Sequence, residues 1–462
     1  MTRIVCVVGA VLASSVLALA DGQTTLPIAP ATPDIQVPGQ IALPGPAAID
    51  ELVKKPLTAD DAARVALLRQ QTLLIAKASV QSASGARRTA ESALLPSLAL
   101  ESVSSSVNVI TRAPANGPSP QVSNSTAQSL SLQQLLFNFS HSEDLVRQAA
   151  DLEEAAKRAY EMSRNDLVNQ VKQAFYTYVQ DLSLIDAADA NVRNTKAQVD
   201  LAQARLDSGL GAPADVVNAK TQYADAIVSL TEARQTATAA RMSLATAMGL
   251  DPRTPITAAT PSEERPVAED MNSLVDQALK LRPEMAEATA VLNAAQAGLN
   301  AARTGTAPSL VFNASIDDIG TSNPFSAVDT SFGVTLSWTL YDSGYTAGKI
   351  DQAKAGVVTA KAQLDLTSQS VVGDVSLAYL NLRAAEQRAI VTTANVAVAQ
   401  QGVLLAQGRY KAGVTTFLEV ITAQTSLFTA QTNDVTAKAA IQQARAALAR
   451  AVGKPSPAEA RL

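Results

Sequence analysis

Two carboxylates, Asp215 and Glu419, are the side chains whose placement best suggests chemistry. Each comes six residues after a glycine, Gly209 or Gly413, and stands where a helix is expected to begin. A carboxylate at a helix N-terminus is stabilised by roughly 0.3–1 kcal/mol, which is one reason for its presence there. The functional interpretation is that such carboxylates, where several are held close together, attract cations and repel one another.

The rest of the sequence offers little for catalysis. His141 is the only histidine and Cys6 the only cysteine, so neither a histidine-based triad nor a disulfide can be assembled. No Gly-rich phosphate loop follows a strand, and no metal-ligand spacing is present. We therefore predict no catalytic site, no bound metal and no cofactor. The net charge of −5 gives no basic surface for nucleic acid.

An internal duplication must position these residues. The stretch 137–249 aligns with 341–453 at a constant shift of 204 residues and without a gap, so that Asp215 falls on Glu419. A duplication of this length predicts two structural repeats that share one fold and lie as neighbours.

The first part of the chain is typical of export. Residues 1–20 have the features of a secretory signal peptide, with an apolar run from Ile4 to Leu17 that is too short for a spanning helix. A short membrane anchor is the alternative. Cys6 lies in this segment, so the mature chain would have no cysteine to lipidate. Residues 21–55 are rich in proline and glycine and should form an extended arm. No later segment has 18 uninterrupted apolar residues, so an exported chain would be soluble or would cross a membrane as β-strands.

Long helices are expected where prolines are absent. Residues 140–208 and 344–408 are the two candidates, and the first would run about 100 Å at 1.5 Å per residue. Each ends at a glycine turn, after which a helix returns over 215–248 or 419–452. Two further helices, 58–94 and 271–304, are predicted to precede the strands.

Four short segments alternate with a period of two. The clearest is 331–341, in which Phe332, Val334, Leu336, Trp338 and Leu340 share one apolar face, and 309–317 repeats the pattern. The segment 127–137 is weaker, and 97–109 changes phase, which indicates a bulge or a misplaced boundary. Each has about the length that a tilted strand needs to span a bilayer. Four strands cannot close a barrel, for which about eight is the minimum, so we expect three copies to supply twelve.

This arrangement resembles the TolC-like outer membrane efflux protein family over nearly the whole mature chain. The resemblance rests on "RYKAGVTTFLEVITAQTSLFTA" at 409–430, on "RLDSGLGAPADVVNAKTQYADA" at 205–226 and on the strand-to-helix junction "LYDSG" at 340–344. The first junction, "LFNFS" at 136–140, departs by lacking the glycine. The family implies a mostly α fold with a membrane β-barrel: a homotrimer with a twelve-stranded barrel in outer membrane lipid and a long periplasmic helical barrel.

The same resemblance implies partners and site residues. Such channels are exit ducts for inner-membrane pumps of the resistance-nodulation-division or ABC type, docked through a periplasmic adaptor protein. Asp215, Tyr410 and Glu419 would line an aperture at the periplasmic end. Three-fold symmetry would make Glu419 a ring of carboxylates, although Asp215 and Glu419 also suit plain helix starts. Thr415 and Thr422 stand where members carry a basic latch residue and a second aspartate, so this aperture should be less charged and less firmly latched.

The glycine turns would form the exposed tips of the helical barrel. The candidates for adaptor docking are Gly209, Gly211, Gly413 and Val414, whose other explanation is helix capping. Trp338 and Tyr341 would belong to an aromatic girdle at the membrane interface, with ordinary packing as the alternative.

The predicted organisation is as follows: signal peptide 1–20; arm 21–55; first repeat 56–252, with strands 97–109 and 127–137 and helical hairpin 140–249; linker 253–268; second repeat 269–454, with strands 309–317 and 331–341 and helical hairpin 344–453; tail 455–462.

An outer membrane exit channel is the function predicted. A structural or adhesive coiled-coil protein of the cell surface would show sustained apolar heptads without paired strands, and an exported enzyme would need a catalytic cluster. The sequence leaves the cargo open among drugs, metals and proteins.

Overall fold

The computed structural model describes residues 55–113, 117–259, 270–320 and 328–454. All of these belong to one unit of the chain, 48–462. The predicted signal peptide, nearly all of the arm, most of the linker and the tail lie outside the described residues.

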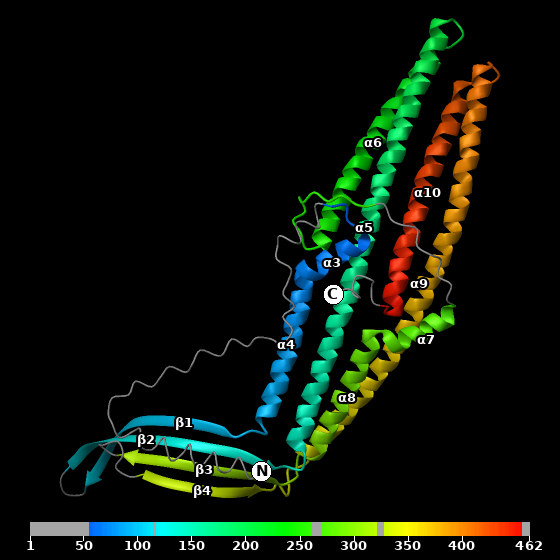
Figure 1. Cartoon of the computed structure of the whole chain (residues 1–462). Helices are drawn as coiled ribbons and strands as arrows, with labels where there is room; N and C mark the ends of the chain where they lie inside the picture. Colours follow the sequence, from blue (N-terminus) through cyan, green and yellow to red (C-terminus); the bar gives the residue numbers. More distant parts are fainter. Residues whose placement is uncertain (1–54, 114–116, 260–269, 321–327, 455–462) are drawn as a thin grey trace. The chain divides into compact units, whose positions relative to one another are not determined.

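The same six elements occur twice in chain order (Figure 1). The first set is α3 (Ala59–Arg69), α4 (Gln71–Ser92), β1 (Ser97–Ala113), β2 (Gly117–Phe137), α5 (His141–Asp207) and α6 (Pro213–Ala247). The second set is α7 (Met271–Leu281), α8 (Pro283–Arg303), β3 (Ser309–Gly320), β4 (Val328–Ser337), α9 (Tyr345–Lys411) and α10 (Phe417–Val452). Two structural repeats therefore underlie the duplicated sequence.

The long helices α5 and α9 contain 67 residues each and pack against their return helices, α6 and α10 (Figure 1). The return helices begin two residues earlier than predicted, at Pro213 and Phe417. Proline suits this first helical position because its fixed φ is preorganised and its missing N–H is not needed there. The predicted range of α9 ended too early, because the helix continues past Gly408 to Lys411.

Each long helix starts from a pair of residues with left-handed backbone. These are Phe139 (φ 55°) and Ser140 (φ 64°) in the first repeat, and Ser343 (φ 54°) and Gly344 (φ 89°) in the second. The geometry of the junction is thus retained where its glycine is missing. A non-glycine residue in this region costs roughly 1–2 kcal/mol, so the first junction stores more strain than the second.

The prediction of a single helix before each strand pair was wrong. A break at Gln70 separates α3 from α4, and a break at Arg282 separates α7 from α8. Pro283 explains the second break, because a residue that precedes proline is driven out of the helical region. At the first break the Gln70 side chain caps α4 by accepting from the Gln71 N–H at 2.9 Å.

The strands form one antiparallel sheet in the order β1-β2-β3-β4. Of the two explanations for the phase change in β1, the misplaced boundary holds, since the strand runs to Ala113 and not to 109, and no bulge interrupts its pairing with β2. An irregularity occurs instead in β2, between Leu135 and Phe137. β4 ends at Ser337, so Trp338 and Tyr341 follow the strand rather than belonging to it.

The register gives the sheet one apolar and one polar face. Leu98, Leu132, Ala314 and Phe332 form one row across the four strands. Ala99, Ser131, Ser315 and Ser331 form the adjacent row, and successive residues of a strand point to opposite faces. Leu98 and Phe332 are 61% and 81% exposed, so the apolar face is uncovered in a single chain.

Equivalent residues build a core in each repeat. The first core joins α3, α5 and α6 and the second joins α7, α9 and α10. Matching pairs at the 204-residue shift are Leu167 and Val371, Val171 and Val375, Tyr178 and Leu382, Leu244 and Leu448, and Met248 and Val452. Full burial of such a side chain contributes roughly 1.5–3 kcal/mol, and it anchors each hairpin against its short helix.

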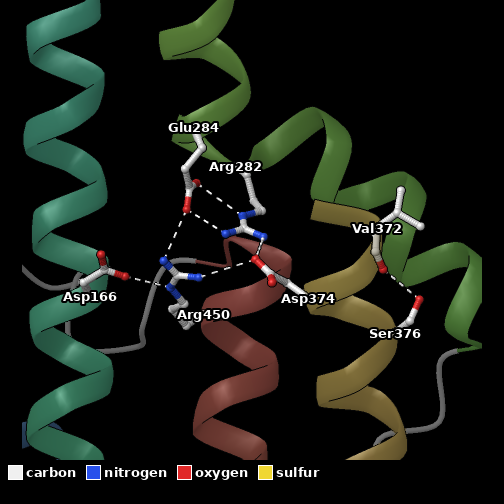
Figure 2. Close-up of polar contacts among 7 residues, drawn as sticks. All are labelled: Asp166, Arg282, Glu284, Val372, Asp374, Ser376 and Arg450. Carbon is white, nitrogen blue, oxygen red and sulfur yellow. Dashed lines mark hydrogen bonds and ion pairs between the residues drawn. The ribbon is translucent and has the colours of Figure 1, made fainter. Parts of the chain in front are cut away.

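The second core is bordered by an ion-pair network of Arg282, Glu284, Asp374 and Arg450 (Figure 2). Arg282, whose side chain is 3% exposed, contacts Glu284 at 2.7 Å and Asp374 at 3.0 Å. Arg450 contacts Glu284 at 3.4 Å and Asp166 of α5 at 2.7 Å. Burial raises the pKa of Glu284, but the hydrogen bond from Arg282 and the charges of both arginines lower it below its usual value. The network thereby links α10 and α8 to the other repeat.

Among the described helices, α9 alone passes a length and composition test for a membrane span. It contains an 18-residue stretch with mean hydropathy 1.4, of which 17% is buried. Charged and polar residues interrupt the apolar stretches of α9, so the helix contains no run of 18 apolar residues. Leu377, Val391, Val398 and Leu405 are 61–68% exposed on this helix, so its apolar surface also lacks a cover in the single chain.

Candidate functional site at the helix tips

The two glycine turns are built alike. In the first, the Gly209 N–H donates to the Leu206 carbonyl and the Leu210 N–H to the Arg205 carbonyl. In the second turn, the Gly413 N–H donates to the Tyr410 carbonyl and the Val414 N–H donates to the Arg409 carbonyl. This pair of bonds is the Schellman motif, in which the glycine takes a left-handed conformation. The φ values of +72° and +73° show that both glycines have a capping role.

Asp215 and Tyr410 meet across the two repeats. The Tyr410 hydroxyl donates to Asp215 Oδ2 at 2.9 Å, although the residues are 195 positions apart. Tyr410 is 4% exposed, and its ring centroid lies 5.3 Å from that of Phe417. Burial raises the pKa of Tyr410, and its bond to the charged Asp215 raises it further. Two of the three predicted aperture residues are therefore in direct contact.

Glu419 is held apart from that pair. Arg409 contacts Glu419 Oε1 at 2.8 Å, and the Thr415 hydroxyl donates to Oε2. The sequence led us to expect Glu419 in a ring of carboxylates, and within one chain the side chain has a cation and a hydroxyl beside it. Sequence reasoning missed Arg409, although its position four residues before Gly413 placed it at the same turn. The charge of Glu419 is therefore partly neutralised within its own hairpin.

Arg205 is a second residue that sequence reasoning missed. Its guanidinium carbon lies 4.7 Å from the Tyr410 ring centroid. It donates to the Lys411 carbonyl at 3.1 Å and to the Leu210 carbonyl at 3.4 Å. The alignment of Arg205 with Arg409 was visible in the sequence, but their different contacts were not.

The remaining tip candidates differ in their surroundings. A Cβ at Gly211 would lie 2.9 Å from the Leu206 nitrogen, so this glycine is required by close packing. A Cβ at Gly209 or Gly413 would meet open space, and only backbone conformation favours glycine there. Val414 is 69% exposed directly after its turn.

The aromatic candidates lie beyond β4. Trp338 is 61% exposed and Tyr341 is 85% exposed. His141 belongs to the junction instead, where its Nδ1 lies 2.9 Å from the Ala301 carbonyl and joins α5 to α8.

Comparison with known proteins places this architecture. The profile of the outer membrane efflux protein family matches the chain twice, over residues 62–250 and 274–454. The chain belongs to the outer membrane efflux protein family. The two matched segments coincide with the two structural repeats, and membership places the protein in the outer membrane.

Relatives within the family show the extent of the similarity. The outer membrane efflux protein BepC of Brucella suis is 29% identical over 307 residues, which are 64% of this chain and 65% of BepC. The outer membrane protein TolC of Escherichia coli is 26% identical over 66% of this chain and 64% of TolC. The chain thus aligns with slightly less than two thirds of each curated relative.

A solved structure shows the same fold over more of the chain. The outer membrane protein VceC of Vibrio cholerae superposes with a TM-score of 0.74 at 20% identity, covering 88% of this chain and 96% of VceC. The mostly helical, two-repeat fold is thereby confirmed. Nothing in these comparisons supports a surface coiled-coil protein, and the family description names efflux rather than catalysis.

Proposed function

We propose that this protein is the outer membrane exit channel of a tripartite efflux or type I secretion system. Three copies would close one twelve-stranded barrel in lipid and one helical barrel beneath it. Cargo would enter from an inner-membrane pump through a periplasmic adaptor and leave without catalysis. The observation that carries this proposal is the open four-stranded sheet, apolar on one face and polar on the other.

The open edges of the sheet support assembly. β1 and β4 are its outer strands, and each has one side without a paired strand among the described residues. Backbone groups that lack partners are not tolerated in lipid, so a spanning sheet must close on itself. Four strands are too few for a barrel, and further copies of the same sheet supply the rest.

The two faces of the sheet suit lipid and water. The Leu98–Phe332 row would face the hydrocarbon, and the Ser131–Ser331 row would face the lumen. On the polar face the Ser315 and Ser331 hydroxyls lie 2.9 Å apart, and Asn313 donates to Thr335 at 3.1 Å. The same face also carries Asp317, whose Oδ2 accepts from the Ser315 hydroxyl at 2.6 Å. A polar lumen of this kind, with some negative charge, is compatible with passive conduction.

The exposed stripe on α9 supports the same assembly. Leu377, Val391, Val398 and Leu405 fall at multiples of seven residues, which is the spacing of a coiled-coil seam. Their counterparts on α5 are Gln173, Ala187, Asn194 and Leu201, which make a more polar surface. The stripe belongs to the second repeat alone, and we assign it to contact with a neighbouring copy.

The helix tips would form the periplasmic aperture. Asp215 and Tyr410 would hold the two tips of one chain together, and their separation would accompany opening. The Arg409–Glu419 pair would reduce the negative charge at the entrance. Val414 and Leu210, 69% and 72% exposed at equivalent positions, would be available to the adaptor.

Cell fractionation tests the assembly. The protein should be recovered in the outer membrane, and unheated samples should migrate as a trimer that becomes a monomer on heating. A soluble monomer that is released without detergent would contradict the proposal.

Adaptor docking can be tested separately from folding. Val414→Asp changes an exposed tip without touching the left-handed glycine, whereas Gly413→Ala introduces backbone strain of roughly 1–2 kcal/mol. We expect Val414→Asp to abolish efflux in cells while the heat-sensitive trimer persists. Loss of the trimer in Val414→Asp would assign this residue to assembly instead of docking.

A further inference from the structure

We propose that Arg205 is the positioning residue that ties the two helix tips together and holds Tyr410 against Asp215. This inference rests on the proposed channel function, because it assigns a task within the aperture. It concerns a residue of the first repeat whose contacts lie largely on the second.

The contacts of Arg205 span both turns. One guanidinium nitrogen, Nη2, lies 3.4 Å from the Leu210 carbonyl of its own turn. The other, Nη1, donates to the Lys411 carbonyl of the second turn at 3.1 Å. The guanidinium also lies over the Tyr410 ring at 4.7 Å. A single side chain therefore contacts the ends of both long helices.

The bond to Lys411 satisfies a group that the turn leaves open. A helix ends with carbonyls that have no partner within the helix. At the second turn the carbonyls of Arg409 and Tyr410 accept from Val414 and Gly413, respectively. The backbone bonds of the described turns provide no such donor for the Lys411 carbonyl, and Arg205 supplies it. A cation at a helix C-terminus is also favoured by the helix dipole.

The arrangement also fixes the orientation of Tyr410. Its ring contacts both the Arg205 guanidinium and the Phe417 ring, and its hydroxyl binds Asp215. Cation–π contacts of this kind contribute more when they are removed from water, and Tyr410 is buried. Arg205 thus acts on the Asp215 contact through Tyr410.

Gly211 leaves room for this side chain. A Cβ at position 211 would lie 3.0 Å from Arg205 Cβ as well as close to the backbone of Leu206. The glycine predicted to serve adaptor docking is therefore needed to seat Arg205.

The repeat provides a matched control. Arg409 occupies the same place relative to its own turn, but it pairs with Glu419 of the same hairpin at 2.8 Å. The contact across the repeats is therefore not a general consequence of an arginine at this position. Replacing Arg205 should loosen both turns, whereas replacing Arg409 should leave the contacts between the first and second tips intact.

Amide hydrogen exchange on the purified trimer in detergent tests whether Arg205 stabilises the second turn. Arg205→Ala should increase exchange of the Gly413 and Val414 amides by about tenfold, because a charge-assisted bond to their turn is lost. Arg205→Lys keeps a cation that can lie over the ring and should recover part of the protection. In Arg409→Ala the Leu210 amide of the first turn should exchange as in the wild-type protein. Unchanged exchange of Gly413 and Val414 in Arg205→Ala would overturn the proposal.

Planar-bilayer recordings of the same proteins test the consequence. Arg205→Ala should raise the conductance several-fold over wild type, with Arg205→Lys between them. If exchange rises but Arg205→Ala conducts as wild type does, the contact is structural and the proposed role at the aperture is wrong. If exchange rises but none of the proteins carries current, the channel function fails while the tie between the tips stands.

Discussion

Gln70 and Arg282 occupy the same place in the two repeats, yet they bind their surroundings with different chemistry. Each is the single residue between two short helices, and each lies against the glycine that ends a return helix, Gly249 or Gly453. Gln70 donates to the carbonyls of Thr246 and Ala247 at 3.3 Å and 3.2 Å. Arg282 instead holds two carboxylates, and Arg450 extends that network to the other repeat.

Replacing Arg282 by glutamine, the residue at the equivalent break of the first repeat, should destabilise the protein more than replacing Gln70 by alanine. Arg282→Gln leaves Glu284 and Asp374 without their principal cation, and breaking a buried pair costs about 3–5 kcal/mol before discounting for partial exposure. We expect a loss of about 2–4 kcal/mol in the free energy of unfolding, measured by urea denaturation with circular dichroism in detergent. Gln70→Ala, which removes two neutral hydrogen bonds, should cost about 1–2 kcal/mol. An equal or larger effect of Gln70→Ala would refute this ranking.

Low pH should weaken the ion pair between Arg282 and Glu284. The pKa of Glu284 is lowered in the folded protein, so its contribution is present above the ordinary glutamate pKa of about 4.3 and is lost as pH falls through the lower, folded value. Thermal unfolding temperatures recorded between pH 6 and pH 3 (about three units spanning that value) should fall more steeply for wild type than for Glu284→Gln. Parallel curves would show that Glu284 does not titrate with folding.

High pH should break the hydrogen bond between Tyr410 and Asp215. Burial and the bond to Asp215 raise the pKa of Tyr410, so the hydrogen bond is stable below the ordinary tyrosine pKa of about 10 and is lost as pH rises through the higher, folded value. The difference in ultraviolet absorption between wild type and Tyr410→Phe should reveal one tyrosine that ionises later than the ordinary residue. Ionisation at or below the ordinary value would contradict the buried, acceptor-paired state of Tyr410.

The strained first junction predicts a stabilising substitution. Ser140 has φ 64° where the second repeat has Gly344, and glycine adopts this conformation without a Cβ penalty. Ser140→Gly should raise the free energy of unfolding by about 0.5–1 kcal/mol, after the added flexibility of the unfolded chain is deducted. Gly344→Ser makes the reverse change and should lower it. The prediction would be wrong if both substitutions destabilised the protein equally.

The repeat and its helical hairpins could be predicted because glycine turns and proline-free stretches are local signals. The break at Arg282 was also local, since Pro283 follows it, but it was overlooked. The break at Gln70 has no such mark and depends on carbonyls about 176 residues away. The start of β2 was hidden because Pro118 and Pro120 argue against a strand. There β2 pairs with β1 alone, and an edge tolerates proline because one side needs no donor.

The helix tips show a similar division. Asp215, Tyr410 and Glu419 could be selected because the family resemblance implies that aperture residues flank the turns. Their partners could not, because Arg205 and Arg409 are equivalent in sequence and differ only in which neighbour lies within reach. The 204-residue shift relates positions, whereas contacts between the two repeats break that symmetry.

Single-channel conductance of the purified trimer in a planar bilayer tests the central claim most directly. The account predicts discrete current steps from the wild-type protein and a several-fold larger conductance for Tyr410→Phe, which lacks the hydroxyl that binds Asp215. Absence of steps from both proteins, although each inserts in the bilayer as a heat-sensitive trimer, would contradict the account.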